Sequence, residues 1–172
     1  VLHVLAREIS PNLRFNALHG LIVQLGFDFF GFSCWTSLDA RPVLWSTFPA
    51  GWIKTYKTRR YTDVDPRIAH CRRSILPIFW NEEFFRCAPG MWSDAQTFGM
   101  CHGWSQGAHS EGVFSILDVS RRDGPIGDEE WYEKAGQVLL LCNVIHMNQV
   151  DELKRKIEAL HPVSYTHLRA HE

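Results

Sequence analysis

The order of patterned segments along the chain most narrows the folds that it can adopt. Apolar residues at helical spacing occur near both ends of the chain, and strand-like runs lie between them. The helical patterns cover residues 11–25 and 128–160, and the strand patterns cover residues 27–35, 43–48, 104–108 and 113–119. Because strands and helices do not alternate regularly, a parallel sheet of βαβ units is disfavoured. The sequence predicts an α+β fold, with an antiparallel sheet covered by helices.

Short segments fill the middle of the chain. Helix-start signals include Ser10-Pro11, Asp65-Pro66 and Asp128, where a polar side chain can cap the first turn. The predicted short helices open at Pro49 and Gly51, after Asp65 and at 92–100. A single helical turn is predicted at 81–85, a turn at 39–42 and an extended piece at 76–80.

Composition restricts the protein class. The 172 residues are 45% apolar and include seven Trp and eleven Phe, which indicates one packed domain rather than disorder. The formal net charge of −1 shows no basic excess for nucleic-acid binding. No apolar run of about 18 residues predicts a membrane span. We therefore expect a protein that does not enter the membrane.

Five scattered cysteines favour neither a disulfide framework nor a zinc site. They are Cys34, Cys71, Cys87, Cys101 and Cys142, and none belongs to a C-x2-C pair. An odd number of separated thiols fits a reducing compartment, so we expect a cytoplasmic protein. We expect the domain to cover residues 1–163. The last residues, 164–172, lose the preceding helical periodicity and are predicted to be a non-native tail.

Aromatic residues and one carboxylate recur in residues 48–80 without a nucleophile–base pair. This stretch contains Trp52, Tyr56, Tyr61, Asp65 and Trp80. Aromatic walls bury the apolar body of a ligand, and a few polar groups fix its orientation. The combination therefore predicts a ligand pocket rather than a catalytic cleft.

The spacing W-x3-Y-x4-Y-x3-DP, followed by x13-W, resembles the ligand-binding domain of LuxR-type quorum-sensing receptors. The runs FPAGW and AHCRRSILPIFW are most similar to the LasR branch. The resemblance implies a five-stranded antiparallel sheet between two helical layers, with the ligand held between the sheet and one layer. It also implies an N-acyl-homoserine lactone as ligand, a homodimer, no cofactor and no enzymatic activity. The resemblance also implies that DNA binding needs a helix-turn-helix domain, which we expect to lie outside this chain.

The resemblance assigns roles to individual residues. Trp52 would donate its indole N–H to the lactone carbonyl, and Asp65 would accept the ligand amide N–H. Asp65 could instead serve only as the N-cap before Pro66. Trp80 would pack beside the lactone ring and Tyr56 along the acyl chain. Trp52 and Trp80 could instead be ordinary core aromatics, and Tyr56 an amphipathic residue at the core boundary. Tyr61 belongs to the same motif.

Strand residues complete the predicted site. Alternation places Ser115 on one face with Val113 and Leu117, where a serine needs a partner. The resemblance makes that partner the acyl carbonyl, while a local backbone bond is the alternative. Gly31, Ser33 and Trp35 share a face of the first strand and would line the acyl channel, and Gly103 matches a glycine of the family.

Three positions depart from the family pattern. Phe48 stands where many members carry a tyrosine whose hydroxyl holds the acyl carbonyl, and Phe48 cannot donate. Ile53 replaces an arginine that is linked to 3-oxo ligands in the LasR branch. Arg67 replaces a smaller residue, and it could turn outward or read an additional polar group of the ligand.

Other functions remain as alternatives. An orphan receptor for a non-lactone molecule would keep the fold and change the ligand. A hydrolase would need a metal cluster or a G-x-S-x-G turn, and the sequence contains neither. We therefore assign no catalytic and no metal-binding residues.

Overall fold

The structure is a computed structural model that describes residues 5, 10–36 and 42–160. The helices are α2 (Pro11–Gln24), α3 (Ala50–Thr58), α4 (Pro66–Cys71), α5 (Pro89–Thr97) and α6 (Asp128–Leu160), with a 3-10 turn, η1 (Tyr61–Asp63). The strands are β1 (Phe29–Thr36), β2 (Val43–Ser46), β3 (Ile78–Phe79), β4 (His102–Ser110) and β5 (Val113–Arg121). As predicted, the Ser10 side chain caps α2, where its oxygen accepts the N–H of Leu13.

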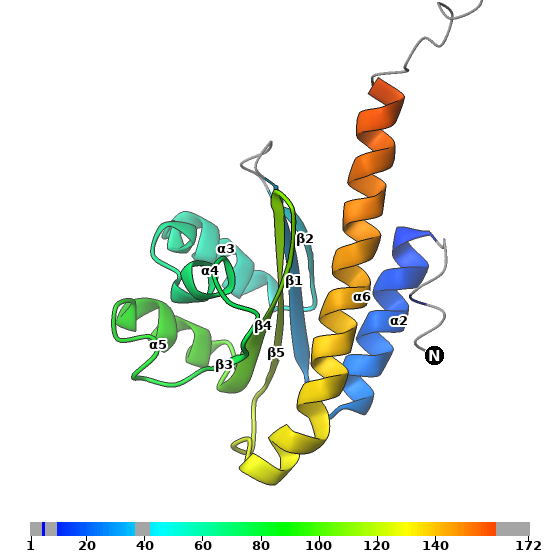
Figure 1. Ribbon diagram of the computed structural model, residues 1–172. Helices are drawn as coiled ribbons and strands as arrows, with labels where there is room; N and C mark the ends of the chain where they lie inside the picture. The colour runs from blue at the N-terminus through cyan, green and yellow to red at the C-terminus, as the bar shows by residue number, and fades with distance from the viewer. Residues whose placement is uncertain (1–4, 6–9, 37–41, 161–172) are drawn as a thin grey trace, which may run out of the picture.

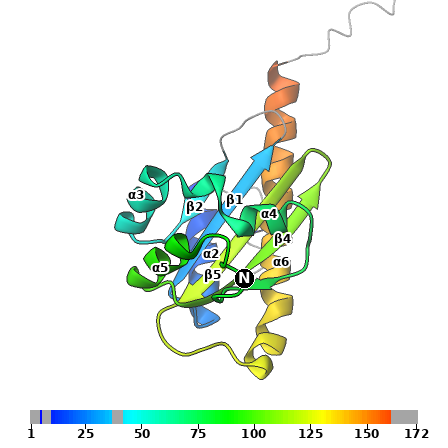
Figure 2. The same ribbon diagram turned by 90° about the vertical axis from the view of Figure 1, so that its left-hand side faces the viewer.

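The five strands form one antiparallel sheet in the order β2-β1-β5-β4-β3. Helices α2 and α6 cover one face, and α3, α4 and α5 lie over the other (Figures 1 and 2). This arrangement confirms the predicted α+β fold with a sheet between two helical layers. No helix in the described part of the chain is long and apolar enough to cross a membrane.

The two faces of the sheet carry different cores. Phe30, Phe32 and Cys34 of β1 belong to the cluster that packs under α2 and α6. Phe29 belongs to a second cluster with Trp52 and other aromatic side chains of the α3–α5 layer. Alternate residues of one strand thus serve different layers, and the functional groups on the α3–α5 side come from the other set of positions.

Several predicted boundaries differ from the structure. The helix predicted at 92–100 spans Pro89–Thr97, because Pro89 supplies the first helical position rather than a preceding turn. The helical turn predicted at 81–85 is present as a single turn, closed by the bond from the Phe85 N–H to the Asn81 carbonyl oxygen at 3.1 Å. The strand predicted at 104–108 is longer, since β4 pairs with β5 along its whole length. The predicted tail, the domain boundary at 163 and most of the turn at 39–42 lie outside the described residues.

The start of α6 is tied to the end of β5 by an ion network. Both carboxylate oxygens of Glu130 accept from Arg121, at 2.6 Å each, and Lys134 also contacts Glu130 at 2.5 Å. These hydrogen bonds lower the pKa of Glu130 to about 2 against the opposing effect of burial. The carboxylate is therefore stabilised in the folded state relative to the unfolded chain.

We predict that this network makes folding acid-sensitive. A depressed pKa means that the Glu130 contribution is complete above its ordinary pKa of 4.5 and is lost as the pH falls toward 2. The Glu130→Gln variant should therefore show a flatter fall in unfolding free energy between these pH values. The measurement is chemical denaturation across that window, and curves parallel to wild type would contradict the assignment.

The sheet also meets α4 closely at Gly107 of β4. A Cβ placed there would lie 2.5 Å from the Ser74 carbonyl oxygen and 3.3 Å from the Cys71 carbonyl oxygen. Gly107→Ala should destabilise the domain by roughly 1–3 kcal/mol, the usual cost of overpacking. At the exposed position Gly20 of α2, an added Cβ meets open space, so Gly20→Ala should raise the unfolding free energy by up to about 1 kcal/mol through helix propensity. Thermal unfolding compares the two, and equal effects would refute this close contact.

Candidate ligand-binding site

A cavity of about 560 Å³ lies between the sheet and the α3–α4 side of the molecule. Its wall includes Leu44, Phe48, Trp52, Ile53, Ile68 and Ile116, together with the polar residues Tyr56, Asp65, Arg67 and Asp118. Its size and mostly apolar wall with a few grouped polar side chains are typical of a small-molecule site.

The aromatic part of the wall comes from α3. Trp52 and Tyr56 are four residues apart, so they share one face of the helix, and their rings meet edge to face with centroids 5.5 Å apart. Trp52 is only 2% exposed and lines the cavity. Its indole nitrogen is not among the fully buried, unpartnered atoms of the described residues, so it keeps contact with open space, where an indole N–H can bond to a ligand. Trp52 can therefore donate to a molecule in the cavity.

The polar part of the wall begins with Asp65, the N-cap of α4. Its Oδ1 accepts the backbone N–H of Arg67 at 2.9 Å, which satisfies the capping role predicted for it. The Arg67 side chain also turns back onto this carboxylate, with Nε 3.0 Å from Oδ1 and Nη2 2.7 Å from Oδ2. The Tyr56 hydroxyl donates to Oδ2 at 2.7 Å.

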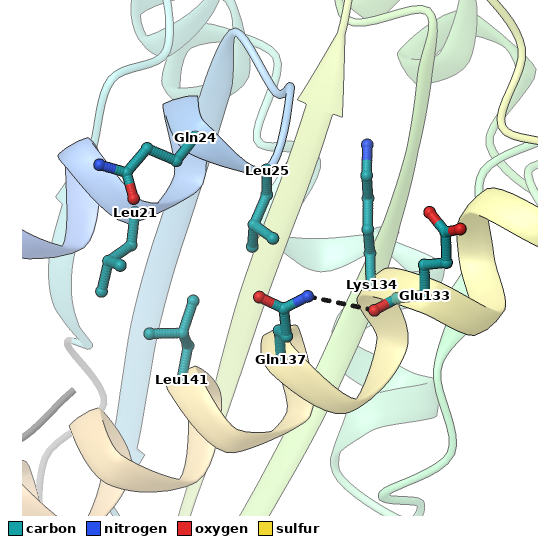
Figure 3. A pocket seen from close by; sticks show the side chains of 7 residues that line it. All are labelled: Leu21, Gln24, Leu25, Glu133, Lys134, Gln137 and Leu141. Atoms are coloured by element: carbon teal, nitrogen blue, oxygen red, sulfur yellow. Dashed lines mark hydrogen bonds between the residues drawn. The ribbon is translucent and has the colours of Figure 1, made fainter. Parts of the chain in front are cut away.

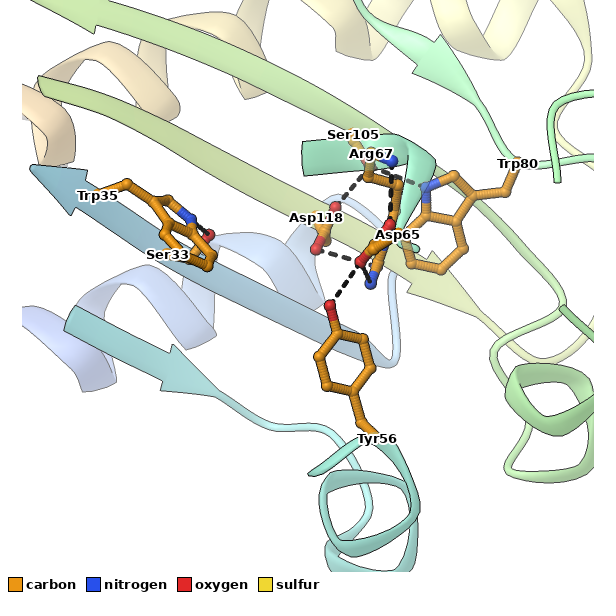
Figure 4. A network of polar contacts seen from close by, with 8 residues as sticks. All are labelled: Ser33, Trp35, Tyr56, Asp65, Arg67, Trp80, Ser105 and Asp118. Carbon is orange, nitrogen blue, oxygen red and sulfur yellow. Dashed lines mark hydrogen bonds and ion pairs between the residues drawn. The ribbon is translucent and has the colours of Figure 1, made fainter. Parts of the chain in front are cut away.

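A second carboxylate, Asp118 of β5, completes this network (Figure 4). Arg67 Nη1 lies 3.1 Å from Asp118 Oδ2, and Ser105 Oγ donates to Asp118 Oδ1 at 2.5 Å. Trp80 Nε1 in turn donates to Ser105 at 2.9 Å, and the Arg67 guanidinium stands over the Trp80 ring at 5.1 Å from its centroid. We call Tyr56, Asp65, Arg67, Trp80, Ser105 and Asp118 the Arg67 network.

Burial makes the charges of this network depend on one another. The Arg67 side chain is 8% exposed and that of Asp65 is 2% exposed. Burial opposes the charge of Arg67, but Asp118 and Asp65 hold its pKa well above the ordinary value. Burial raises the pKa of Asp118, while Arg67 and Ser105 act against this rise. Burial and the neighbouring Asp65 raise the pKa of Tyr56, so its hydroxyl stays protonated and donates.

Most residues of the predicted site meet in this cavity. The lining includes Gly31, Ser33, Trp35, Phe48, Trp52, Tyr56 and Asp65. The Phe48 ring covers Gly31 so closely that a side chain at position 31 would collide with it. Ser33 Oγ accepts the indole N–H of Trp35 at 3.2 Å, which fixes Trp35 along the strand. Arg67, whose direction the sequence left open, points inward.

The expectation for Ser115 is wrong in its placement. Ser115 pairs with Cys34 across the β5–β1 ladder, and directly opposed residues point to the same face of a sheet. Cys34 lies in the core under α2 and α6, and Ser115 Oγ is accordingly 2.8 Å from Nδ1 of His146 on α6. Ser115 does not line the cavity, and its partner belongs to the protein.

Three residues of the predicted site lie outside the cavity lining, namely Tyr61, Trp80 and Gly103. Tyr61 stacks on Trp52 and donates to Asp94 at 2.7 Å, which positions the wall. Trp80 backs Arg67, as described above. At Gly103, a Cβ would overlap the Val119 carbonyl oxygen, so this position needs a glycine for close strand packing. Their predicted contacts with a ligand stay predictions.

Asp118 and Ser105 were not predicted from the sequence. They oppose each other on β5 and β4, on the α3–α5 face. Asp118 was detectable, because a lone acid inside the apolar run VFSILDVS is rarely buried without a partner. Ser105 carried no comparable signal, since its role depends on the pairing of two strands.

A second hollow of about 400 Å³ lies between α2 and α6 on the other side of the sheet (Figure 3). Leu21, Leu25 and Leu141 form its apolar part, and Gln24, Glu133, Lys134 and Gln137 form the rest. It lacks a network of buried polar groups comparable to that around Arg67. Within the described ranges, no three His, Cys, Asp or Glu side chains are grouped to hold a metal ion.

The Tyr56 hydroxyl should contribute to stability through its bond to Asp65. Tyr56→Phe removes one donor from a buried carboxylate and should lower the unfolding free energy by about 2 kcal/mol. Tyr132→Phe, on the exposed outer face of α6, is the matched control and should change it by less than about 0.5 kcal/mol. Denaturant titration measures both variants. Equal values would show that the Tyr56–Asp65 bond contributes no net stability.

Comparison with known proteins identifies the family of this chain. Residues 13–148 match the family model described as autoinducer binding domain. The transcriptional activator protein PhzR of Pseudomonas fluorescens is 32% identical over 112 residues, which cover 63% of this chain and 46% of PhzR. The quorum-sensing regulator RhlR of Pseudomonas aeruginosa is 25% identical over 89% of this chain and 65% of its own length. The chain thus spans less than two thirds of these relatives.

Solved structures share the fold. The LuxR-family factor CepR2 of Burkholderia cenocepacia, described as dependent on N-acylhomoserine lactone, aligns with a TM-score of 0.78 at 23% identity, covering 89% of this chain and 96% of CepR2. SdiA in complex with octanoyl-rac-glycerol aligns with a TM-score of 0.70 at 20% identity, covering 87% of this chain and 64% of SdiA. With the family-model match, these findings confirm the resemblance seen in the aromatic motif: the chain belongs to the autoinducer-binding domains of LuxR-type quorum-sensing regulators.

Proposed function

We propose that this domain binds an N-acyl-homoserine lactone and serves as the sensing part of a quorum-sensing transcription factor. The observation that carries the proposal is the cavity itself, in which an apolar wall ends at a buried polar network. An acyl lactone has the matching form, because its apolar tail ends in a compact group with carbonyl oxygens. The regulators among the relatives support the same role.

The acyl tail and the lactone ring would contact different parts of the cavity wall. The tail would run along Phe48, Leu44 and Ile116, which offer apolar surface. The lactone carbonyl would accept the free indole N–H of Trp52. Because ligand binds the folded domain and not the unfolded chain, binding would raise the stability of the fold.

Assembly and DNA binding form the second part of the proposal. Helix α6 carries exposed apolar residues on its outer side, namely Tyr132, Leu139, Leu140, Met147 and Ile157. We propose that this helix contributes to a homodimer interface, since exposed apolar rows often mark such contacts. DNA would be bound by a helix-turn-helix domain outside this chain, as in a LuxR-type regulator.

A second candidate is a receptor for a non-lactone acyl compound. The Arg67 network favours it, because Arg67 already occupies the carboxylate expected to receive a lactone amide. The SdiA structure, which holds octanoyl-rac-glycerol, supports the idea that this fold accommodates an acyl compound of another class. We propose no enzymatic activity, because the described cavity lining contains no Cys and no His, and the pKa of its Tyr56 hydroxyl is raised rather than lowered.

We predict that one range of acyl chain lengths raises the melting temperature of the domain. The experiment measures thermal unfolding with N-acyl-homoserine lactones of graded length and repeats it for Trp52→Phe, which keeps an aromatic ring but loses the indole N–H. This loss should weaken binding by about tenfold, equivalent to one hydrogen bond. Trp92→Phe on α5, whose ring stacks on Phe85 away from the cavity, is the matched control and should bind as wild type does.

The outcomes separate the two candidate functions. No shift with any lactone, in a well-folded protein, would reject the lactone proposal. A shift with acylglycerols alone would favour the non-lactone receptor. An equal loss of binding in both tryptophan variants would show that Trp52 has no specific contact with the ligand.

A further inference from the structure

The Asp65 carboxylate has no capacity left for a ligand. Its two oxygens accept the Arg67 backbone N–H, the Arg67 Nε–H and Nη2–H, and the Tyr56 hydroxyl, all at 3.0 Å or less. A carboxylate offers about four lone-pair positions. These four donors fill them, so a ligand N–H could reach Asp65 only by displacing Arg67 or Tyr56.

Arg67 is held on several sides and is costly to displace. It also contacts Asp118 at 3.1 Å and packs over the Trp80 ring. With Arg67 in place, one positive charge faces two buried carboxylates. If Arg67 left, both carboxylates would remain buried without a counterion, which is strongly unfavourable. The network therefore favours a ligand that leaves Arg67 where it stands.

Arg67 keeps donors that the network does not use. A guanidinium carries five N–H hydrogens. The contacts with Asp65 and Asp118 engage one hydrogen on each of the three nitrogens, which leaves one hydrogen on Nη1 and one on Nη2. Arg67 lines the cavity, as Trp52 does with its free indole N–H. Two side chains at the polar end thus present unused donors, while the Asp65 acceptors are taken.

We propose that Arg67, rather than Asp65, contacts the polar head of the ligand, and that the site selects a neutral acyl compound through its acceptor oxygens. This inference rests on the proposed function and narrows its ligand. Two carboxylates share the one guanidinium, so the site has no positive charge in excess to attract an anionic ligand. Phe48 has no donor for an acyl carbonyl, and Ser115 lies on the other face of the sheet. Ser33 also lines the cavity but is already bonded to Trp35, so we assign the acyl carbonyl to the two unused donors of Arg67. A ligand amide N–H contributes little here.

The test compares two ligands that differ in one group. One is an N-acyl-homoserine lactone, and the other is the lactone of the same chain length in which an ester oxygen replaces the amide N–H. Titration calorimetry on the wild-type domain should give affinities within about fivefold of each other. An ester oxygen facing an available carboxylate would instead be repelled, and the amide would bind far more tightly.

A double variant with unchanged net charge tests the opposite case, in which Asp65 is free to accept the ligand amide. Arg67→Met with Asp118→Asn removes one charge of each sign, keeps the side-chain volumes and frees Asp65 to accept an amide. This variant should prefer the amide ligand by more than about tenfold. Arg86→Met with Glu83→Gln removes an exposed ion pair away from the cavity and should behave as wild type does.

Each result decides one point. A wild-type preference for the amide beyond about fivefold would overturn the inference and leave the proposed function standing. Equal binding of both ligands by a folded double variant would also overturn it, because Arg67 would then not set the preference. If wild type binds neither ligand at any chain length, the lactone proposal fails and the inference falls with it. The wild-type comparison is decisive even if the double variant does not fold.

Discussion

The buried guanidinium of Arg67 between two carboxylates is the interaction on which the rest of the site depends. It joins the start of α4, which carries Asp65, to the centre of the sheet, which carries Asp118. Tyr56 brings α3 to the same point through its bond to Asp65. Because unpaired buried charges are strongly unfavourable, these elements are held in one arrangement. The polar end of the cavity is a consequence of that arrangement.

The sheet makes this arrangement possible because alternate residues of a strand face opposite sides. One set packs the core, and the other lines the cavity. On β5, Ser115, Leu117 and Val119 pack toward α6, while Ile116 and Asp118 face the cavity. The first set builds a continuous core with α2 and α6. The second set leaves room for a ligand, because it faces short helices that do not fill the space. Substitutions on the α6 side of the strand should therefore affect stability, and those on the cavity side, including Asp118, should affect both stability and recognition.

Much of the site could be predicted from residue patterns that act locally. The four-residue spacing of Trp52 and Tyr56 predicted their shared helix face, and alternation predicted that Gly31, Ser33 and Trp35 line one channel. The α+β class followed from the order of the segments. These inferences use neighbours in sequence, and local geometry fixes them.

The remaining features depend on contacts between distant segments. Alternation groups Ser115 with Leu117, but it cannot say which helical layer that face meets, and the role given to Ser115 was therefore wrong. The direction of Arg67 was undetermined because it depends on Asp118, 51 positions later in the chain. Asp65 showed both an N-cap pattern and a binding-site pattern. The structure shows the capping bond, and the role toward a ligand stays a prediction.

The most direct measurement is a crystal structure of the domain with its bound acyl ligand. We expect the head group to lie against Trp52 Nε1 and the terminal nitrogens of Arg67, with the Arg67–Asp65 and Arg67–Asp118 contacts intact. A ligand amide bonded directly to Asp65, with Arg67 turned out of the cavity, would contradict it.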